Sequence, residues 1–515
     1  MSNPSSASST GVGGLDRGVL SIASVVVLGA IMAILDTTVV NVAIDRLTQD
    51  LDAPLSTIQW IVTGYMLALA TVIPLTGWAA HRFGTKRLYM LSLTLFMGGS
   101  ALAGAAWSAE SLIAFRVLQG LGGGMIMPAG MTILTQAAGP QRIGRVMSIV
   151  GVPMLLGPIM GPILGGWLVD DVSWRWIFYI NVPIGLVALA LAARILPKDE
   201  PSPTERLDAL GLALLSPGLA TLIYGLAESS SGSFASTEVL VPMGIGLALV
   251  IAFILHGLSG RNENPLIDLR LFKERSVAAA ALTMTAFGVA FFGAMLLLPL
   301  YFQVVRGESA LSTGLLLAPQ GFGAMIMMPL AGVLTDRIGP GKLVLTGIPV
   351  ILGTMAVLTQ VGDSTSYWLL GATLVVMGMG TGITMMPTMS AAFSTLRKIQ
   401  VPRASTALNI IQQVAGAVGT AVMSVLLTNA ITDRLAAAGG APGGAPEGGA
   451  SSIPPEVREQ VAPIVADAFA STFVWAVVLL AVSFLPALLL PRTKARPIDE
   501  DEGEGAAEQP VLVHA

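Results

Sequence analysis

The chain has 515 residues, of which 54% are hydrophobic and 11% are charged, and its formal net charge is −4. Soluble domains carry about 25% charged residues, so this composition excludes a soluble globular protein. The absence of cysteine excludes disulfides, thiol chemistry and thiolate metal sites. Because apolar runs recur along most of the chain, we predict an all-α membrane protein.

A hydropathy window of about 19 residues predicts fourteen membrane-spanning helices. The first six lie near residues 19–44, 57–78, 87–107, 111–135, 145–169 and 174–196. Two more lie near 207–227 and 238–258, and the last six near 277–302, 310–334, 342–361, 366–392, 404–430 and 468–490. An even number of spans puts both termini on one side. Most basic residues fall in the loops on that side, so the positive-inside rule predicts cytoplasmic termini.

Two pairs of segments repeat at nearly one interval. Residues 77–84 (GWAAHRFG) match residues 332–339 (GVLTDRIG), and residues 120–128 (GLGGGMIMP) match residues 378–387 (GMGTGITMMP). We therefore predict a duplicated six-helix unit. Parallel repeats of this kind place a substrate site between two bundles.

The repeats divide the chain into five parts. Residues 1–18 are a predicted cytoplasmic tail, and residues 492–515 an acidic, disordered one. Residues 19–196 form the predicted first bundle, and residues 197–276 a two-helix insert. Residues 277–491 form the predicted second bundle, in which residues 431–467 are a Gly/Ala/Pro-rich external loop.

Asp36 is an acid inside the first predicted span. A carboxylate at that depth costs about 2.5–3.5 kcal/mol, and the usual reason is a proton, an ion or a cationic substrate. The alternative is an acid at the outer end of the helix that reaches water.

Arg116 is the second charge predicted inside the membrane, and it needs an acceptor or water because it cannot lose its proton. Close to Asp36 it would favour the ionised carboxylate, whereas burial would favour the neutral acid. The two opposed effects predict a proton switch. The alternative is an interfacial Arg116 that extends its side chain to water.

The fifth predicted span carries a regular glycine and proline pattern. Gly157, Gly161 and Gly165 fall on one helical face, where small residues let backbones approach closely. Pro158 and Pro162 remove backbone donors and bend the helix. We predict a close-packed, bendable seam that suits two bundles rocking against each other, with generic small-residue packing as the alternative.

Side-chain amides inside the spans are the candidates for substrate binding. They are Asn41, Gln119, Gln320, Asn409, Gln412 and Gln413. Hydrogen bonding between helices is the commoner role of such amides. Methionine is abundant, with clusters at 325–328 and 385–389, and it suits promiscuous apolar pockets as well as lipid-facing surfaces.

Four segments resemble the drug:proton antiporters with fourteen helices in the major facilitator superfamily, the EmrB/QacA-like multidrug exporters. They are residues 35–44 (LDTTVVNVAI), 116–122 (RVLQGLG), 151–166 (GVPMLLGPIMGPILGG) and 174–185 (WRWIFYINVPIG). The resemblance covers about residues 19–430. It implies the major facilitator fold, with two six-helix bundles and two inserted helices.

The resemblance also implies a function. We expect from the resemblance that hydrophobic or cationic compounds are exported in exchange for protons, with Asp36 and Arg116 in proton coupling. The expected location is a bacterial plasma membrane.

Two cytoplasmic gate loops follow from the same resemblance. The first holds Gly77, His81, Arg82 and Gly84, and the second holds Asp336, Arg337 and Gly339. The family has Asp in place of His81, so the first latch of the cytoplasmic side is altered. His81 either simply replaces the acid or takes part in pH sensing. The first-helix signature also ends in Asp45 where the family usually has Pro.

Motifs for other functions are absent from the sequence. We find no Walker loop, no HExxH and no nucleophile elbow, and three scattered histidines make no metal site. We expect no enzyme activity, cofactor, metal or nucleic-acid partner. The expected partners are small substrates, protons and the bilayer, and the sequence identifies no accessory protein. Export of one endogenous lipid or natural product, and a non-transporting membrane sensor or scaffold, remain the alternatives.

Overall fold

The computed structural model describes residues 16–139, 142–198, 201, 206–229, 236–259, 265–437 and 455–493. Within these ranges every regular element is a helix, which confirms the predicted all-α fold. The predicted tails lie almost wholly outside the described residues, as do residues 438–454 of the predicted external loop.

The first bundle contains six helical spans, three of which comprise more than one element. Its elements are α1 (Arg17–Val39), η1 (Val40–Ala43), α2 (Ile44–Asp50), α3 (Leu55–Val72), α4 (Leu75–Phe83), α5 (Thr85–Gly104), α6 (Ala109–Ala138), α7 (Ile143–Asp171), α8 (Trp176–Tyr179) and α9 (Asn181–Ile195). Helices α3 and α4 are one predicted span, broken at Pro74, which has no backbone N–H to donate.

The insert and the second bundle follow in the chain. The insert consists of α10 (Ala209–Glu228) and α11 (Thr237–Leu258), followed by η4 (Leu269–Lys273). The second bundle consists of α12 (Arg275–Leu300), η5 (Tyr301–Val305), α13 (Ala310–Ile338), α14 (Pro340–Leu358), α15 (Tyr367–Phe393), η6 (Lys398–Gln400), α16 (Val401–Ala437) and α17 (Pro455–Ala487).

Twelve helical spans among the described residues are long and apolar enough to cross a membrane. Helices α5 and α7, with 20 and 29 residues, run beside them and complete the fourteen predicted spans. Helix α5 is the less apolar of the two because Lys86 and Arg87 occupy its first turn and small residues follow.

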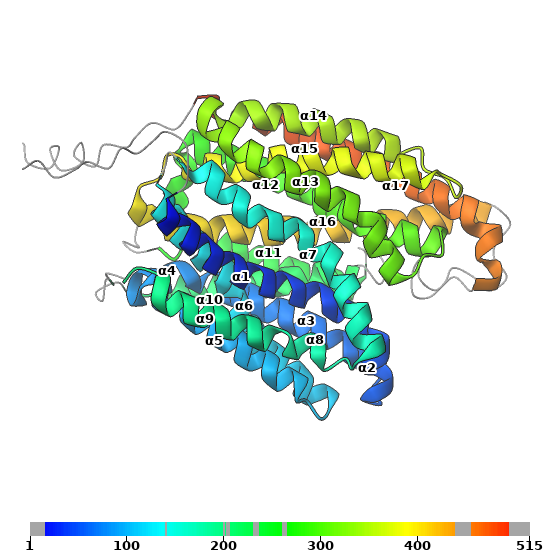
Figure 1. The fold of residues 1–515 in the computed structure, drawn as a ribbon, viewed down its shortest axis with the longest axis horizontal. Helices are drawn as coiled ribbons and strands as arrows, with labels where there is room; N and C mark the ends of the chain where they lie inside the picture. Colours follow the sequence, from blue (N-terminus) through cyan, green and yellow to red (C-terminus); the bar gives the residue numbers. More distant parts are fainter. Residues whose placement is uncertain are drawn as a thin grey trace, which may run out of the picture.

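Both described chain ends lie at one end of the helix bundle, which we call the tail end (Figure 1). There Asp16 pairs with Arg142 at 2.8 Å, and the N–H of Gly341 donates to the carbonyl of Pro491 at 2.9 Å. The opposite end, which carries α2 and α8, is called the far end.

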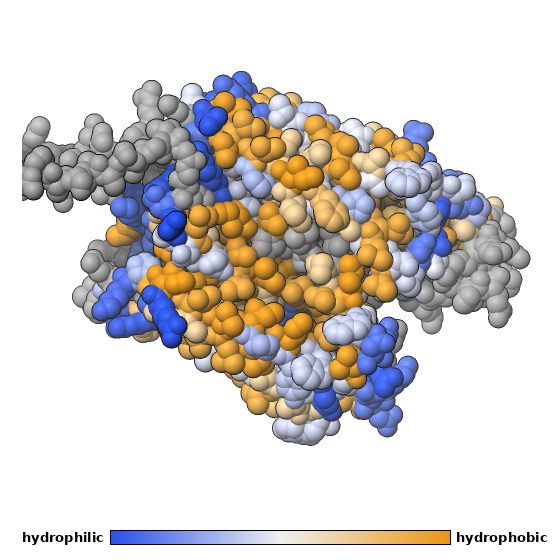
Figure 2. Space-filling view, viewed as in Figure 1, coloured by the Kyte–Doolittle hydropathy of each residue, from blue (hydrophilic) through white to orange (hydrophobic). Residues whose placement is uncertain are grey.

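The middle of the molecule carries an apolar surface. Figure 2 shows hydrophobic residues across the centre of the visible face and hydrophilic residues gathered at both ends. Many large apolar side chains are exposed on the molecule, among them Leu255, Leu258, Leu485 and Ile326. Such a band fits the hydrocarbon core of a bilayer, and the chain is a multi-pass membrane protein.

Both ends of the predicted external loop 431–467 are helical. Helix α16 continues to Ala437 and α17 begins at Pro455, so helices extend into both ends of that range. Arg434 and Asp467 form an ion pair of 3.5 Å between the two extensions. These charges lower the window hydropathy, while buried Ile431 and Leu435 keep the helical period.

The insert lies against the first bundle and reaches the second. Ser216 of α10 donates a hydrogen bond of 2.7 Å to the carbonyl of Thr71 in α3, and Tyr224 stacks on Trp60 of α3. Buried side chains of α10 also share an apolar cluster with Ala407 of α16. Helix α10 therefore packs beside α3 and contacts both bundles.

Candidate functional site

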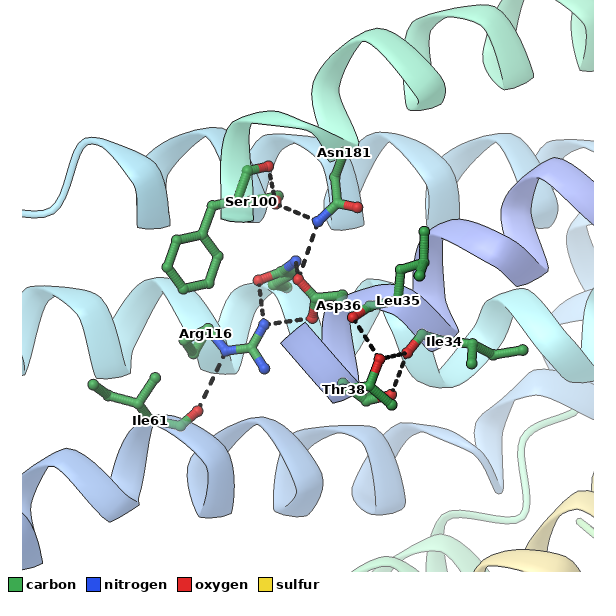
Figure 3. Close-up of polar contacts among 11 residues, drawn as sticks. Ile34, Leu35, Asp36, Thr38, Ile61, Ser100, Arg116 and Asn181 are labelled. Carbon is green, nitrogen blue, oxygen red and sulfur yellow. Dashed lines mark hydrogen bonds and ion pairs between the residues drawn. The ribbon is translucent and has the colours of Figure 1, made fainter. Parts of the chain in front are cut away.

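Asp36 and Arg116 form a buried ion pair inside the first bundle (Figure 3). The Nη1 atom of Arg116 lies 2.5 Å from Oδ2 of Asp36, and each residue is 1% exposed. Neither residue reaches water in this structure. The two residues are enclosed by α1, α3, α5, α6 and α9, so neither has the solvent-exposed position that the alternatives required.

Side-chain amides complete the carboxylate's partners. Nε2 of Gln119 donates to Oδ1 of Asp36 at 2.8 Å, and Nδ2 of Asn181 donates to the same oxygen at 3.1 Å. Oε1 of Gln119 in turn accepts from Arg116 at 2.7 Å. Nδ2 of Asn181 also lies 3.1 Å from Oγ of Ser100 in α5.

The local sequence explains how α6 carries Arg116 into the bundle. Ser108 starts α6 with a capping box, in which Ser108 and Ser111 satisfy each other's backbone N–H groups. The Arg116 guanidinium then lies 4.0 Å above the ring of Tyr65, and its Nε donates to the carbonyl of Ile61 at 3.3 Å. Arg116 is thus held by aromatic and backbone groups of α3 as well as by Asp36.

Glycines let neighbouring helices close around this ion pair. A Cβ at Gly99 of α5 would lie 2.7 Å from the backbone N of Gln119, and one at Gly120 of α6 would lie 2.6 Å from the carbonyl of Tyr65. Real Cβ atoms do not come that close, so side chains there would separate α5 and α3 from α6. The glycine-rich stretch of α6 therefore serves to enclose the site.

The predicted substrate amides lie in different places. Gln119 belongs to the ion-pair cluster, whereas Asn41 is exposed on η1 at the far end. Gln320 of α13 and Asn409 of α16 are buried, and Nδ2 of Asn409 donates to the carbonyl of Ser405 in its own helix. Gln412 and Gln413 are half-buried on α16.

Gln412 lines an apolar cavity of the second bundle. The cavity is formed by α12, α15 and α16, and its wall consists of Met284, Phe287, Gly288, Phe291, Phe292, Met385, Thr388, Met389 and Gln412. The rings of Phe287 and Phe291 stack at 5.5 Å. Only Thr388 and Gln412 bring side-chain hydrogen-bonding groups to this wall, so it suits aromatic and aliphatic groups.

The predicted seam glycines pack against α1, which belongs to the same bundle. A Cβ at Gly157 would overlap Ile34, and one at Gly161 would overlap Thr38. A Cβ at Gly165 would lie 3.1 Å from Cγ1 of Val39. Pro158 and Pro162 lie within α7, but their side chains are outside the description. This glycine face thus joins α7 to the helix that carries Asp36, and not to the second bundle.

The contact of α7 with the second bundle lies nearer the tail end. A Cβ at Gly144 would lie 2.8 Å from the carbonyl of Gly332 in α13, and one at Gly151 would meet Met386 of α15 at 2.7 Å. The N–H of Gly144 donates to Oδ1 of Asp336 at 3.1 Å, and Nε of Arg145 lies 3.3 Å from Oδ2. The second gate loop therefore contacts α7 of the first bundle through Gly332 and Asp336.

The first gate loop occupies the equivalent place on the other side. A Cβ at Gly77 would lie 3.1 Å from Oγ1 of Thr406, 3.4 Å from Cα of Arg403 and 3.5 Å from the carbonyl of Pro402. Gly332 has the same relation to Ser148, Arg145 and Gly144. Pro402 thus stands where the other copy has Gly144, and Arg403 where it has Arg145.

The two gate loops also end alike. Gly84 and Gly339 have φ angles of 93° and 91°, a conformation that favours glycine. Their N–H groups donate to the carbonyls of Ala80 and Thr335, each at 3.0 Å. Arg82 is half-buried and Arg337 is exposed. The repeat read from the sequence is therefore a repeat of backbone geometry.

Two helical bundles related by a repeat, with a buried ion pair in one of them, define a membrane transporter. A family model described as "Major Facilitator Superfamily" matches residues 26–420. The chain belongs to the major facilitator superfamily.

Proteins named for multidrug resistance and export are among its relatives, which agrees with the family that the motifs predict. The chain is 51% identical over 419 residues to the "Multidrug resistance protein B homolog" of Mycobacterium tuberculosis, covering 80% of this chain and 77% of that protein. It is 30% identical over 407 residues to the "Multidrug export protein EmrB" of Escherichia coli K12, covering 78% and 79%. These relatives are transporters, and the chain is a transporter and not an enzyme.

Solved structures share the fold at low sequence identity. The proton:xylose symporter XylE superposes with a TM-score of 0.60 at 14% identity, covering 94% of this chain and 98% of that one. The human organic anion transporter MFSD10 superposes with a TM-score of 0.58 at 15% identity, covering 90% and 100%.

Sequence reasoning missed several members of the site. Asn181 lies in the segment WRWIFYINVPIG, which carried the resemblance without a role for this residue. Ser100 and Tyr65 gave no signal, because a serine and a tyrosine in apolar spans are common. The latch partners Gly144 and Arg145 lie far from Asp336 in the sequence, and only the fold brings them together.

Proposed function

We propose that the chain exports hydrophobic, often cationic compounds in exchange for protons, by alternating access across a bacterial plasma membrane. The ion pair of Asp36 and Arg116 carries this proposal, because ionisable groups inside a membrane are costly and mark proton or ion pathways. Similarity to proteins of multidrug resistance and export supports the substrate class.

Protonation of Asp36 is coupled to a movement of helix α1 in this proposal. The neutral acid no longer balances Arg116, and an uncompensated buried charge costs about 3–5 kcal/mol. Rearrangement of α1 relieves that cost. Helix α1 packs on α7 through Gly157 and Gly161, and α7 contacts α13 at the tail end. A shift of α1 therefore reaches the contact between the bundles.

Asp36 acts as the proton carrier in this proposal, and the substrate binds elsewhere. The carboxylate is 1% exposed and has all its described partners inside the first bundle. The apolar cavity beside Gln412 lies in the second bundle. Separate sites in the two bundles let protons and substrates bind in alternate states without direct competition for one carboxylate.

The tail end is the cytoplasmic side in this proposal, as the basic loops indicate. The latch at Asp336 and the hydrogen bond of 2.9 Å from Oγ of Ser405 to the carbonyl of Pro128 join the bundles on that side. Contacts of this kind close the cytoplasmic side, which is the arrangement of an outward-facing state.

Uphill transport in proteoliposomes tests the proposal. The wild type should concentrate fluorescent cationic dyes against their gradient when a pH gradient is imposed, and Asp36→Asn should not, because an amide cannot titrate. Asp52→Asn is the matched control, since Asp52 is exposed in a loop and its φ of 47° suits Asn. Uphill transport by Asp36→Asn would refute the proposal, and a dye panel separates a multidrug exporter from one with a single endogenous substrate.

A further inference from the structure

The partners of Asp36 suit its ionised form. Three side chains direct N–H groups at its two oxygens, namely Arg116 at Oδ2 and both Gln119 and Asn181 at Oδ1. An ionised carboxylate only accepts hydrogen bonds, so it satisfies all three donors. A proton arriving on Oδ1 turns that oxygen into a donor, and the new O–H needs an acceptor in a site without described access to water.

Two of the three partners cannot supply that acceptor. Arg116 has only donors. Gln119 directs its Oε1 at Arg116, from which it accepts at 2.7 Å, and its Nε2 at Oδ1 of Asp36. Rotating the Gln119 amide would direct its NH2 group at the guanidinium. Gln119 therefore keeps its present orientation whether Asp36 is charged or neutral.

Asn181 has an acceptor atom that makes no hydrogen bond. It is 1% exposed, and its Oδ1 is buried without a hydrogen-bond partner. A half-turn of its amide exchanges Oδ1 and Nδ2 with little change in shape. Oδ1 then faces both Asp36 and the hydroxyl of Ser100. That hydroxyl now donates to the carbonyl of Phe178 at 2.8 Å, and it can donate to Asn181 instead.

We infer that Asn181 is a positioning residue whose amide reverses when Asp36 takes up its proton. It donates to the ionised carboxylate and accepts from the neutral acid. The inference rests on the proposed role of Asp36 in proton coupling and adds how the bundle senses the proton. The proton stays on Oδ1, since Oδ2 remains beside the guanidinium.

The position of Asn181 lets the reversal of its amide affect neighbouring helices. Asn181 is the first residue of α9, directly after the break at Ile180 that separates α8 from α9. Its second contact, Ser100, belongs to α5. A change in the hydrogen bonds of this amide thus reaches the α8–α9 junction and α5, while α1 and α6 carry the ion pair.

Other titratable groups do not replace Asn181 as the acceptor. Among the described residues, the charged or titratable side chains facing Asp36 are Arg116 of α6 and Tyr65 of α3. Gln119, Asn181 and Ser100 are neutral. The hydroxyl of Tyr65 is buried and makes no described hydrogen bond, to Asp36 or to another residue; it lies beside Gly123 of α6, while the Arg116 guanidinium holds the ring face at 4.0 Å.

Infrared difference spectroscopy between low and high pH tests the inference on purified protein. The carboxylic-acid carbonyl band of Asp36 is assigned by its loss in Asp36→Asn. In the wild type this band should lie at the lower wavenumber of an acid whose O–H is hydrogen-bonded. Asn181→Leu, similar in size but without polar atoms, should move it to the higher wavenumber of a free O–H. Isotope-labelled asparagine should also show an amide band that changes with pH and disappears in Asn181→Leu.

Transport supplies a second readout. Asn181→Leu should slow proton-driven uptake about tenfold, the equivalent of one net hydrogen bond to a charged group. Asn181→Thr should recover part of the rate, because a hydroxyl both donates and accepts. Ser92→Ala is the control. It removes another buried hydroxyl of α5, which bonds to the carbonyl of Leu88, and it should change neither the band nor the rate.

The outcomes separate the inference from the proposed function. Uphill transport by Asp36→Asn would refute proton coupling through Asp36 and this inference with it. If Asp36→Asn is uncoupled but Asn181→Leu keeps the wild-type acid band and pH profile, only the role of Asn181 is refuted. If Asn181→Leu does not fold, Asn181→Thr replaces it for assigning the labelled amide band of the wild type. A wild-type band that does not change with pH then refutes the inference.

Discussion

Asp336 and Arg145 form an ion pair of 3.3 Å that joins the second bundle to the first at the tail end. The Asp336 side chain is 8% exposed and also accepts from the N–H of Gly144 at the start of α7. An acid at a helix N-terminus gains from the backbone donors and the dipole there. One carboxylate thus binds a side chain and a helix end of the opposite bundle.

Asp336→Ala should weaken closure of the tail end by about 1.5–3 kcal/mol, the contribution of a hydrogen bond to a charged group. Asp336→Asn should have a smaller effect, because its amide oxygen still accepts from Gly144. A single cysteine at Thr406, which is buried between the bundles, reports closure through its rate of maleimide labelling. Arg337→Ala, which removes an exposed charge of the same loop, is the control. Equal labelling in all variants would show that the latch does not hold the tail end.

His81→Asp alone should not reproduce in the first gate loop the contacts that Asp336 makes in the second. The introduced carboxylate would face the first turn of α16, where Pro402 stands in the place of Gly144 and offers no N–H. Pro402→Gly restores that donor. The double variant should therefore slow cysteine labelling at the tail end by more than the sum of the single changes, with a coupling of about 1 kcal/mol. Additive effects would contradict the equivalence of the two loops.

Gly161→Ala should impair transport even though it adds one methyl group. The new Cβ would overlap Thr38, whose Oγ1 donates to the carbonyls of Ile34 and Leu35. Overpacking of this kind costs about 1–3 kcal/mol, and here it displaces the helix that carries Asp36. Gly166→Ala is the matched control in the same helix, since a Cβ there meets nothing within 4 Å. Transport rates and thermal stability of the two variants should differ clearly.

Cysteine labelling should establish the orientation, because the chain has no native cysteine. Trp107→Cys at the far end and Ile399→Cys at the tail end both replace exposed residues, which are 76% and 69% accessible. In whole cells an impermeant maleimide should label the first and spare the second. After the membrane is permeabilised, both should react. The reverse pattern would place the termini outside the cell.

The sequence by itself determined the spans, the repeat and the two internal charges. Hydropathy is a local property, so fourteen apolar stretches predicted fourteen helices, although residues 431–437 and 455–467 proved helical where a loop was predicted. Asp36 and Arg116 stood out because charge is rare in apolar spans. The repeated gate loops were visible because turn geometry restricts residue choice, as at Gly84 and Gly339.

The tertiary structure alone decided which residues touch. It placed Gln119, predicted to bind substrate, and Asn181, which had no predicted role, on the Asp36 carboxylate, from positions 83 and 145 residues away in the chain. It turned the glycine face of α7 toward α1, and it set Pro402 at the place of a latch donor. Such contacts follow from packing between helices, which hydropathy and periodicity within one helix do not specify.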